Sequence, residues 1–123
     1  MYCIRGAISI DENTVEEIEK KSLKLFDVIL KENNLNEDDI VSILFSCTKD
    51  IDKAYPGKFI REKYHLNKVG IMHFNEMVVE NSLSLCIRVL LLANGHNSNI
   101  KYIYLGEAKK LRNDLSEKNR GFL

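Results

Sequence analysis

The chain has 123 residues, of which 45% are hydrophobic, and its 18 Lys and Arg residues equal its 18 Asp and Glu residues in number. The hydrophobic share excludes a disordered chain, and the zero net charge argues against broad nucleic-acid binding. No apolar run is long enough to span a membrane, and the first residues lack a signal-peptide pattern. We therefore expect a single cytoplasmic domain over residues 1–123, without nucleic-acid or membrane partners.

The first half of the chain predicts a strand, a long helix and a second strand. Alternating residues indicate a strand over residues 2–10, and Thr14 and Glu17 fit a capping box. An amphipathic helix follows, and its apolar stripe comprises Val15, Ile18, Ser22, Leu25, Phe26, Ile29 and Leu30. The apolar residues 40–47 have the length of a strand.

The second half begins with a short helix, since Pro56 suits a first helical position. Strands are predicted over residues 69–74 and 100–105. Residues 83–93 are apolar on almost every side, and we interpret them as a helix buried on two fronts and stopped by Asn94 and Gly95. The whole order indicates an α+β fold with a mixed β-sheet and a long amphipathic helix. From about residue 113 to 123 we expect a loosely held tail.

Cysteine and histidine spacing argues against metal chemistry. The cysteines are odd in number and lie in apolar runs, which is typical of reduced core thiols, and the histidines show no ligand spacing. These residues are Cys3, Cys47, Cys86, His65, His73 and His96. No glycine-rich phosphate loop or nucleophile–base motif is present, so we expect no cofactor and no covalent intermediate.

Two arginines stand in apolar surroundings, where a permanent charge needs a partner or a polar cavity. Arg5 lies within the first strand and Arg88 within the apolar run of residues 83–93. One interpretation is a structural ion pair of Arg88 with Glu76 or Glu80; the other is a site for a bound anion.

The remaining candidates are equally ambiguous alone. Glu76 is either an ordinary carboxylate at the start of a helix or an acceptor for a substrate hydroxyl. Lys58 and Arg61, one helical turn apart, form either a solvated face or the rim of a pocket. Tyr104 should share its side of a strand with Tyr102. Together these residues predict a pocket for a small dicarboxylate that acts by positioning and electrostatics.

Short motifs along nearly the whole chain resemble, in order and spacing, the small α/β class of chorismate mutases. The motifs are Ile4-Arg5-Gly6-Ala7, Tyr55-Pro56-Gly57-Lys58 with Arg61-Glu62, Glu76-Met77, Cys86-Ile87-Arg88-Val89, Tyr102-Ile103-Tyr104-Leu105 and Leu111-Arg112-Asn113-Asp114-Leu115. The resemblance implies an isomerase that converts chorismate to prephenate by a pericyclic Claisen rearrangement, in the pathway to phenylalanine and tyrosine. It also implies a homotrimeric pseudo-barrel with active sites at subunit interfaces.

The resemblance further implies a role for each candidate residue. Arg88 would contact the ether oxygen of the breaking bond, Glu76 would accept the substrate hydroxyl, and Arg5 and Tyr104 would hold a carboxylate. The other substrate-binding positions are Tyr55 and Leu111 on the apolar wall, Lys58, Arg61 and Arg112 at the mouth, and His73. His73 stands where the family commonly has a cysteine, so we expect it to make catalysis more sensitive to pH.

Three alternatives remain at this point. Other trimeric α/β families also build anion sites at interfaces, although the motif of the imine-deaminating family is not found here. A non-catalytic trimer, in which His73 has spoiled the site, is a second alternative. The third is a monomer whose arginines form only structural pairs.

Overall fold

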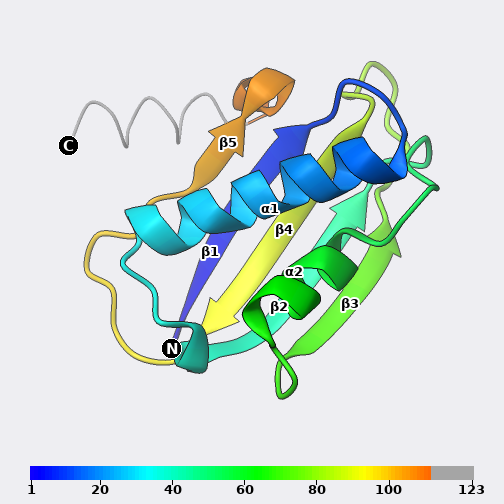
Figure 1. The fold of residues 1–123 in the computed structure, drawn as a ribbon. Helices are drawn as coiled ribbons and strands as arrows, with labels where there is room; N and C mark the ends of the chain where they lie inside the picture. Colours follow the sequence, from blue (N-terminus) through cyan, green and yellow to red (C-terminus); the bar gives the residue numbers. More distant parts are fainter. Residues whose placement is uncertain (112–123) are drawn as a thin grey trace.

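The computed structural model describes residues 1–111, which form a five-stranded sheet with two helices packed on one face (Figure 1). The strands are β1 (Tyr2–Ser9), β2 (Ile40–Cys47), β3 (Gly70–Asn75), β4 (Cys86–Ala93) and β5 (Ile103–Leu105). The helices are α1 (Val15–Glu32) and α2 (Pro56–Tyr64), and short 3-10 helices cover Glu37–Asp39 and Gly106–Lys110. The strand order is β3-β2-β4-β1-β5. β4 is antiparallel to both neighbours, whereas β5 and β3 run parallel to theirs, so the predicted mixed sheet is confirmed.

Helix α1 begins where the sequence predicts. The Thr14 hydroxyl accepts a hydrogen bond from the Glu17 backbone N–H at 3.2 Å, which is half of a capping box. The Glu17 carboxylate accepts instead from the Asp11 backbone N–H at 2.7 Å, so it fastens the loop before the helix. The helix ends at Asn33 and Asn34, and Asn34 has a positive φ of 47°.

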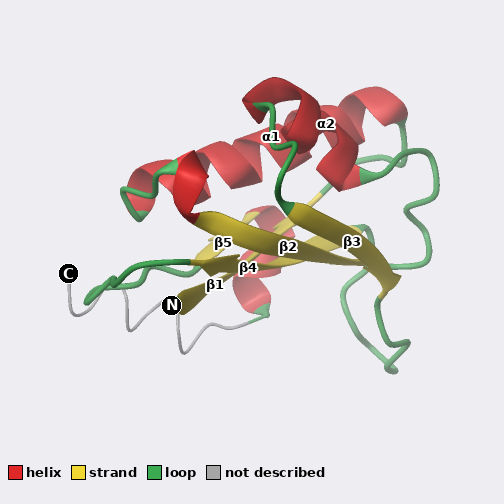
Figure 2. Ribbon diagram, turned by 90° about the horizontal axis from the view of Figure 1, so that it is seen from below, coloured by secondary structure: helices red, strands yellow, loops and turns green. Residues whose placement is uncertain are grey.

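The main core lies between the two helices and the sheet face that they cover (Figure 2). Alternate residues of each strand point to this face, and Ile4, Ile43 and Leu91 are fully buried there. From α1, Ile18 and Ile29 meet them and are also 0% exposed. This interior follows directly from the stripe of α1 and from the two-residue period of the strands.

The helix predicted over residues 83–93 is wrong. Residues Cys86–Ala93 form β4, the middle strand, which pairs with β1 on one side and β2 on the other. A strand paired on both edges and apolar on both faces gives a nearly continuous apolar run, which periodicity alone does not separate from a buried helix. Its alternation is real, however: Ile87 faces the helices, whereas Arg88 and Leu90 face the opposite side.

The sheet face opposite the helices, called here the open face, is only partly covered. Ala7, Cys86, Tyr104 and Ala108 form a small buried cluster at one end of it. Elsewhere on this face Met72, Phe74 and Leu90 are 56%, 49% and 39% exposed. Large apolar side chains at this level of exposure mark a surface that is suited to contact with another protein chain.

The cysteines do not all lie in the core. Cys47 and Cys86 are buried, and burial raises the pKa of the Cys47 thiol to about 12 and that of Cys86 to about 11. Cys3, by contrast, is exposed, so the expectation of three core thiols is wrong for this residue. Among the described residues, no helix combines the length and apolarity needed to cross a membrane.

Candidate active site

One row of residues crosses the open face from edge to edge. Strand register places Tyr104 of β5 opposite Ala7 of β1, Ala7 opposite Arg88 of β4, Arg88 opposite Ser46 of β2, and Ser46 opposite Phe74 of β3. Residues paired across neighbouring strands point to the same face of a sheet. The register therefore brings Arg88 and Tyr104 to one side of the molecule, with a small residue between them.

Arg88, in the middle of this row, forms an ion pair with Glu76. The distance from Arg88 Nη1 to Glu76 Oε2 is 3.1 Å, and the Ser46 hydroxyl donates a hydrogen bond to Glu76 Oε1. The Glu76 backbone N–H donates to the Cys47 carbonyl at 2.8 Å, which fixes the residue beside β2. The structural pairing foreseen for Arg88 is thus present, and the carboxylate has two side-chain donors.

The burial on two fronts expected for residues 83–93 does not hold for Arg88 in the single chain, and Glu76 is not fully buried either. Their side chains are 41% and 24% exposed. An ion pair at this exposure contributes little to stability, about 0–1 kcal/mol. The two charged groups can therefore exchange partners with a bound ligand at small cost.

Arg5 of β1 and Tyr104 of β5 lie on the same face as this ion pair. Arg5 lies two residues before Ala7 on the same face of β1, and its guanidinium carbon is 4.5 Å from the centre of the Tyr102 ring. Tyr102, Tyr104 and Leu111 pack in the same cluster, which confirms that the two tyrosines share a side. We call Arg5, Glu76, Arg88 and Tyr104 the open-face group.

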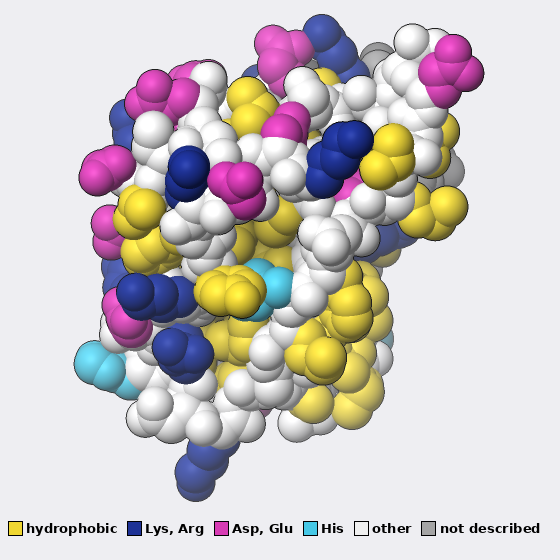
Figure 3. All heavy atoms as spheres, turned by 90° about the vertical axis from the view of Figure 1, so that its right-hand side faces the viewer, with side chains coloured by type: hydrophobic (Ala, Val, Ile, Leu, Met, Phe, Trp, Pro, Cys, Tyr) yellow, Lys and Arg dark blue, Asp and Glu magenta, His cyan; other side chains and the backbone are white. Residues whose placement is uncertain are grey.

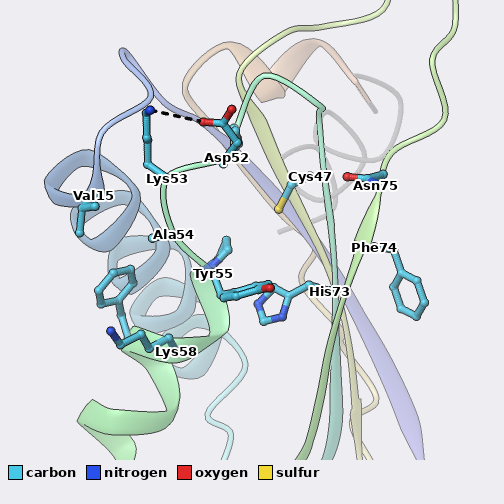
Figure 4. A pocket seen from close by; sticks show the side chains of 13 residues that line it. Val15, Cys47, Asp52, Lys53, Ala54, Tyr55, Lys58, His73, Phe74 and Asn75 are labelled. Carbon is cyan, nitrogen blue, oxygen red and sulfur yellow. Dashed lines mark ion pairs between the residues drawn. The ribbon is translucent and has the colours of Figure 1, made fainter.

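Three other predicted residues gather elsewhere, around a cavity of about 610 Å³ beside the N-terminus of α2. Tyr55, Lys58 and His73 line it, together with Phe74 and Asn75 of β3. In Figure 4 the rings of Tyr55 and His73 lie against each other, whereas Phe74 turns to the other side of β3. Figure 3 shows Lys and Arg side chains beside a partly sunken histidine on this flank. The volume is that of a small-molecule site.

His73 is held in this cavity by contacts on several sides. Its Nε2 accepts a hydrogen bond from the Gly57 backbone N–H at 2.9 Å, and its ring stacks on Phe45 with a centroid distance of 5.1 Å. Partial burial, followed by the charge of Arg61, lowers the pKa of His73 below its ordinary value. We call Tyr55, Lys58, Arg61 and His73 the α2 group.

Within one chain the two groups do not meet. None of the open-face group lines the 610 Å³ cavity, because α2 and His73 lie on the helix side of the sheet. Glu76 borders a different, smaller cavity of about 140 Å³, with Met77 and Leu83. Arg112 lies outside the described residues, as does the tail from about residue 113 to 123. A ligand that touches both groups therefore needs two copies of the chain.

The family model of chorismate mutase type I matches residues 1–115. The chain belongs to this family. It is 35% identical over 115 residues to the chorismate mutase AroH of Bacillus subtilis (strain 168), which spans 92% of this chain and 91% of the relative. It is 32% identical over 115 residues to that of Thermus thermophilus, spanning 91% and 93%. A solved chorismate mutase from Clostridium thermocellum superposes with a TM-score of 0.84 at 38% identity, covering 89% of this chain and 99% of that one.

Sequence reasoning missed one residue that contacts the open-face group, Ser46. Its hydroxyl donates to Glu76, and its register places it opposite Arg88. Within the apolar run of β2, Ser42 and Ser46 are the polar positions, and they fall on one face at an even spacing. That alternation was visible in the sequence, but the partner of Ser46 was not.

Proposed function

We propose that this protein converts chorismate to prephenate at sites built from the open-face group of one copy and the α2 group of a second copy. The chain is an isomerase with chorismate mutase activity, which commits carbon to phenylalanine and tyrosine. The observation that carries the proposal is the Arg88–Glu76 pair, part-exposed on the open face of a chain from this family. Three cysteines without disulfide partners support a cytoplasmic location.

Arg88 has the central role in the proposed chemistry. In the Claisen rearrangement the ether bond breaks, and negative charge grows on its oxygen in the transition state. A fixed guanidinium at that oxygen stabilises the transition state more than the ground state, which raises turnover. Glu76, held by Ser46 and Arg88, accepts the substrate hydroxyl and so orients the ring.

The other residues bind the substrate in its reactive conformer. Arg5 and Tyr104 hold a carboxylate, and Tyr55 and Leu111 form the apolar wall of the site. Lys58 and Arg61 on α2, with Arg112, attract the dianion at the mouth. Holding a flexible molecule in the folded conformer lowers the entropic part of the barrier, so the reaction needs no covalent intermediate.

A homotrimer would bring the two groups together. The open face carries exposed apolar residues, including Met72 and Phe74 on the edge strand β3, and these are suited to an interface. The open-face group and the α2 group lie on opposite sides of one sheet, so a cyclic arrangement can juxtapose them between neighbours. The zero net charge removes overall repulsion between copies.

The loss of chorismate's diene absorbance tests the activity. We expect the purified protein to consume chorismate, and the Arg88→Ala variant to lose roughly a hundredfold or more in turnover. Circular dichroism on both proteins shows whether the variant folds. No consumption by folded wild type would mean a binding or structural protein on this scaffold.

Mixing two inactive variants tests whether each site is shared. The first is Arg88→Ala, and the second is the Lys58→Ala/Arg61→Ala double variant. Refolded together, they should regain about a quarter of wild-type activity, because in that fraction of interfaces both contributing halves are intact. Each variant refolded alone is the control. If mixing adds nothing to the separate activities although the two chains co-assemble, the site lies within one chain.

A further inference from the structure

The first turn of α2 lacks the usual side-chain cap. The first N–H groups of a helix have no partner within it, and a capping side chain normally accepts from one of them. Tyr55 stands at the cap position, yet its side chain makes no capping hydrogen bond. Pro56 has no N–H to donate. The Gly57 N–H is therefore the first donor of the helix, and it donates to His73 Nε2 at 2.9 Å.

This hydrogen bond determines the protonation state of His73. A backbone N–H can only donate, so Nε2 must carry a lone pair, and the neutral ring then holds its proton on Nδ1. Aromatic contacts fix the ring in this orientation. Phe45 stacks on it at an interplanar angle of 11°, and Tyr55 lies at a centroid distance of 5.0 Å.

The absence of a side chain at Gly57 leaves room for the imidazole of His73. A Cβ atom at this position would lie 2.9 Å from His73 Nε2 and Cε1, and 2.6 Å from Cγ2 of Ile71. Carbon atoms do not approach so closely, so a residue with a side chain would push the imidazole away. The hydrogen bond from this position to His73 therefore requires a glycine as the second residue of α2.

The charged groups around His73 favour its neutral form. From α2, Arg61 acts on the ring and Lys58 lines the same cavity. The connection before α2 contributes Lys53 and Asp52, but the Asp52 carboxylate already accepts from the Asn13 amide at 2.7 Å. Among the titratable groups, Tyr55 faces the ring and the thiol of Cys47 lies on β2. Burial and Arg61 accordingly lower the pKa of His73 from 6.5.

We propose that His73 is a positioning residue of the chorismate mutase site: its unprotonated Nε2 caps α2 through Gly57 and so places Tyr55, Lys58 and Arg61 for substrate capture. This inference rests on the proposed function of those residues. Protonation of His73 puts two donors face to face and adds a cation beside Lys58 and Arg61. The first turn of α2 then loses its anchor to β3.

The sign of the pH effect follows from the direction of the shift. Because the native pKa lies below the unfolded value of 6.5, the unfolded chain binds more protons between the two values. The stabilisation by the cap is therefore complete above 6.5 and is lost as the pH falls through that window. The ratio kcat/KM reports on the native protein, so it should fall as the pH drops through the lowered native pKa of His73.

Nitrogen-15 NMR of the histidine rings in the wild-type protein tests the cap without substrate. We expect the Nδ1–H form of His73 at neutral pH, a titration midpoint below 6.5, and a shift of the Gly57 amide signal at that same midpoint. His65 and His96 are internal references. An Nε2–H form, or a Gly57 signal that ignores the titration, would overturn the proposal whatever the protein's activity.

Two variants then separate the acceptor from the ring. His73→Gln keeps a neutral acceptor at the reach of Nε2, whereas His73→Phe keeps the stacking on Phe45 but leaves the Gly57 N–H without an acceptor. We expect His73→Phe to raise KM roughly fivefold to tenfold with a smaller change in kcat. His73→Gln should keep both parameters near wild type and lose the acidic fall in kcat/KM.

The outcomes are distinguishable from failure of the proposed function. An unchanged KM in folded His73→Phe, or an acidic fall that persists in His73→Gln, would contradict the positioning role. If the wild type does not turn over chorismate at all, the proposed function fails, and with it the catalytic purpose of the cap. The NMR result still decides whether the cap exists.

Discussion

At the scale of single residues, the sequence allowed Arg88 either a structural ion pair or a place in an anion site, and the structure is compatible with both. Arg88 and Glu76 form the foreseen ion pair, yet they are 41% and 24% exposed, so the pair is accessible from the open face. A buried pair would be costly to separate, whereas this one is not. The geometry is therefore compatible with a resting contact that a substrate replaces.

Arg88→Lys tests the planar geometry of the guanidinium. The lysine keeps the charge but lacks the fork of donors that contacts an ether oxygen and a carboxylate together, so we expect turnover to fall roughly a hundredfold or more with an unchanged fold. Arg61→Lys in α2 is the matched control and should change turnover little. Near-wild-type turnover in Arg88→Lys would move the role of this residue to structure.

Ser46→Ala tests the support of Glu76. Loss of the hydroxyl removes one of two side-chain donors to the carboxylate, so we expect kcat/KM to fall roughly fivefold to tenfold. The effect should largely vanish when Ser46→Ala is added to Glu76→Gln, since the two residues act through one contact. Independent, additive effects in this double-mutant cycle would contradict the assignment.

At the scale of elements, β4 decides the site because it carries Arg88 between β1 and β2. In a helix, the side chains beside Arg88 would be those three or four residues away in the chain. In β4, Arg88 instead lies opposite Ala7 of β1 and Ser46 of β2. The alternation of β4 sends Ile87 to the core and Arg88 to the open face. The site is thus a product of strand register.

Amide hydrogen exchange checks this assignment. β4 pairs along both edges, so we expect the amides of Cys86–Ala93 to be among the slowest to exchange, approaching the free energy of global unfolding. In β3, an edge strand, alternate amides should exchange faster. Rapid exchange throughout β4 would contradict its central place in the sheet.

At the scale of the whole molecule, the sheet has one covered face and one open face, and the predicted site is divided between them. The α2 group lies with the helices, and the open-face group lies with exposed Leu90, Met72 and Phe74. One chain therefore presents two separate groups, and the proposed site requires association between copies.

Leu90→Glu tests this dependence on assembly. Leu90 points away from the helices and is 39% exposed, so the single chain tolerates a charge there, whereas burying an unpaired carboxylate in an interface is strongly unfavourable. We expect the trimer to dissociate and turnover to be lost together, as measured by native mass and chorismate consumption. Lys24→Glu, at an exposed position of α1, is the control. A fully assembled Leu90→Glu trimer would place the interface elsewhere.

Most of the fold was predictable because local patterns and tertiary packing agree. The stripe of α1, its Thr14 cap, Pro56 at the start of α2, and strands near residues 2–10 and 40–47 all reappear. β5 begins at Ile103, later than predicted, and β4 was mistaken for a helix. Strand pairing comes from residues distant in the chain, so no local window could show that both edges of β4 are occupied.

The sequence by itself determined the family, through motifs whose order and spacing persist along the chain, and it determined the chemistry of the site through its few arginines. Only the tertiary structure decided which of these residues meet. Sheet register put Arg88 opposite Ser46 and Ala7, and packing turned His73 onto Gly57, away from the open-face group. The reason is physical: residue type fixes what a side chain can do, whereas its partners depend on contacts between strands and helices far apart in the sequence.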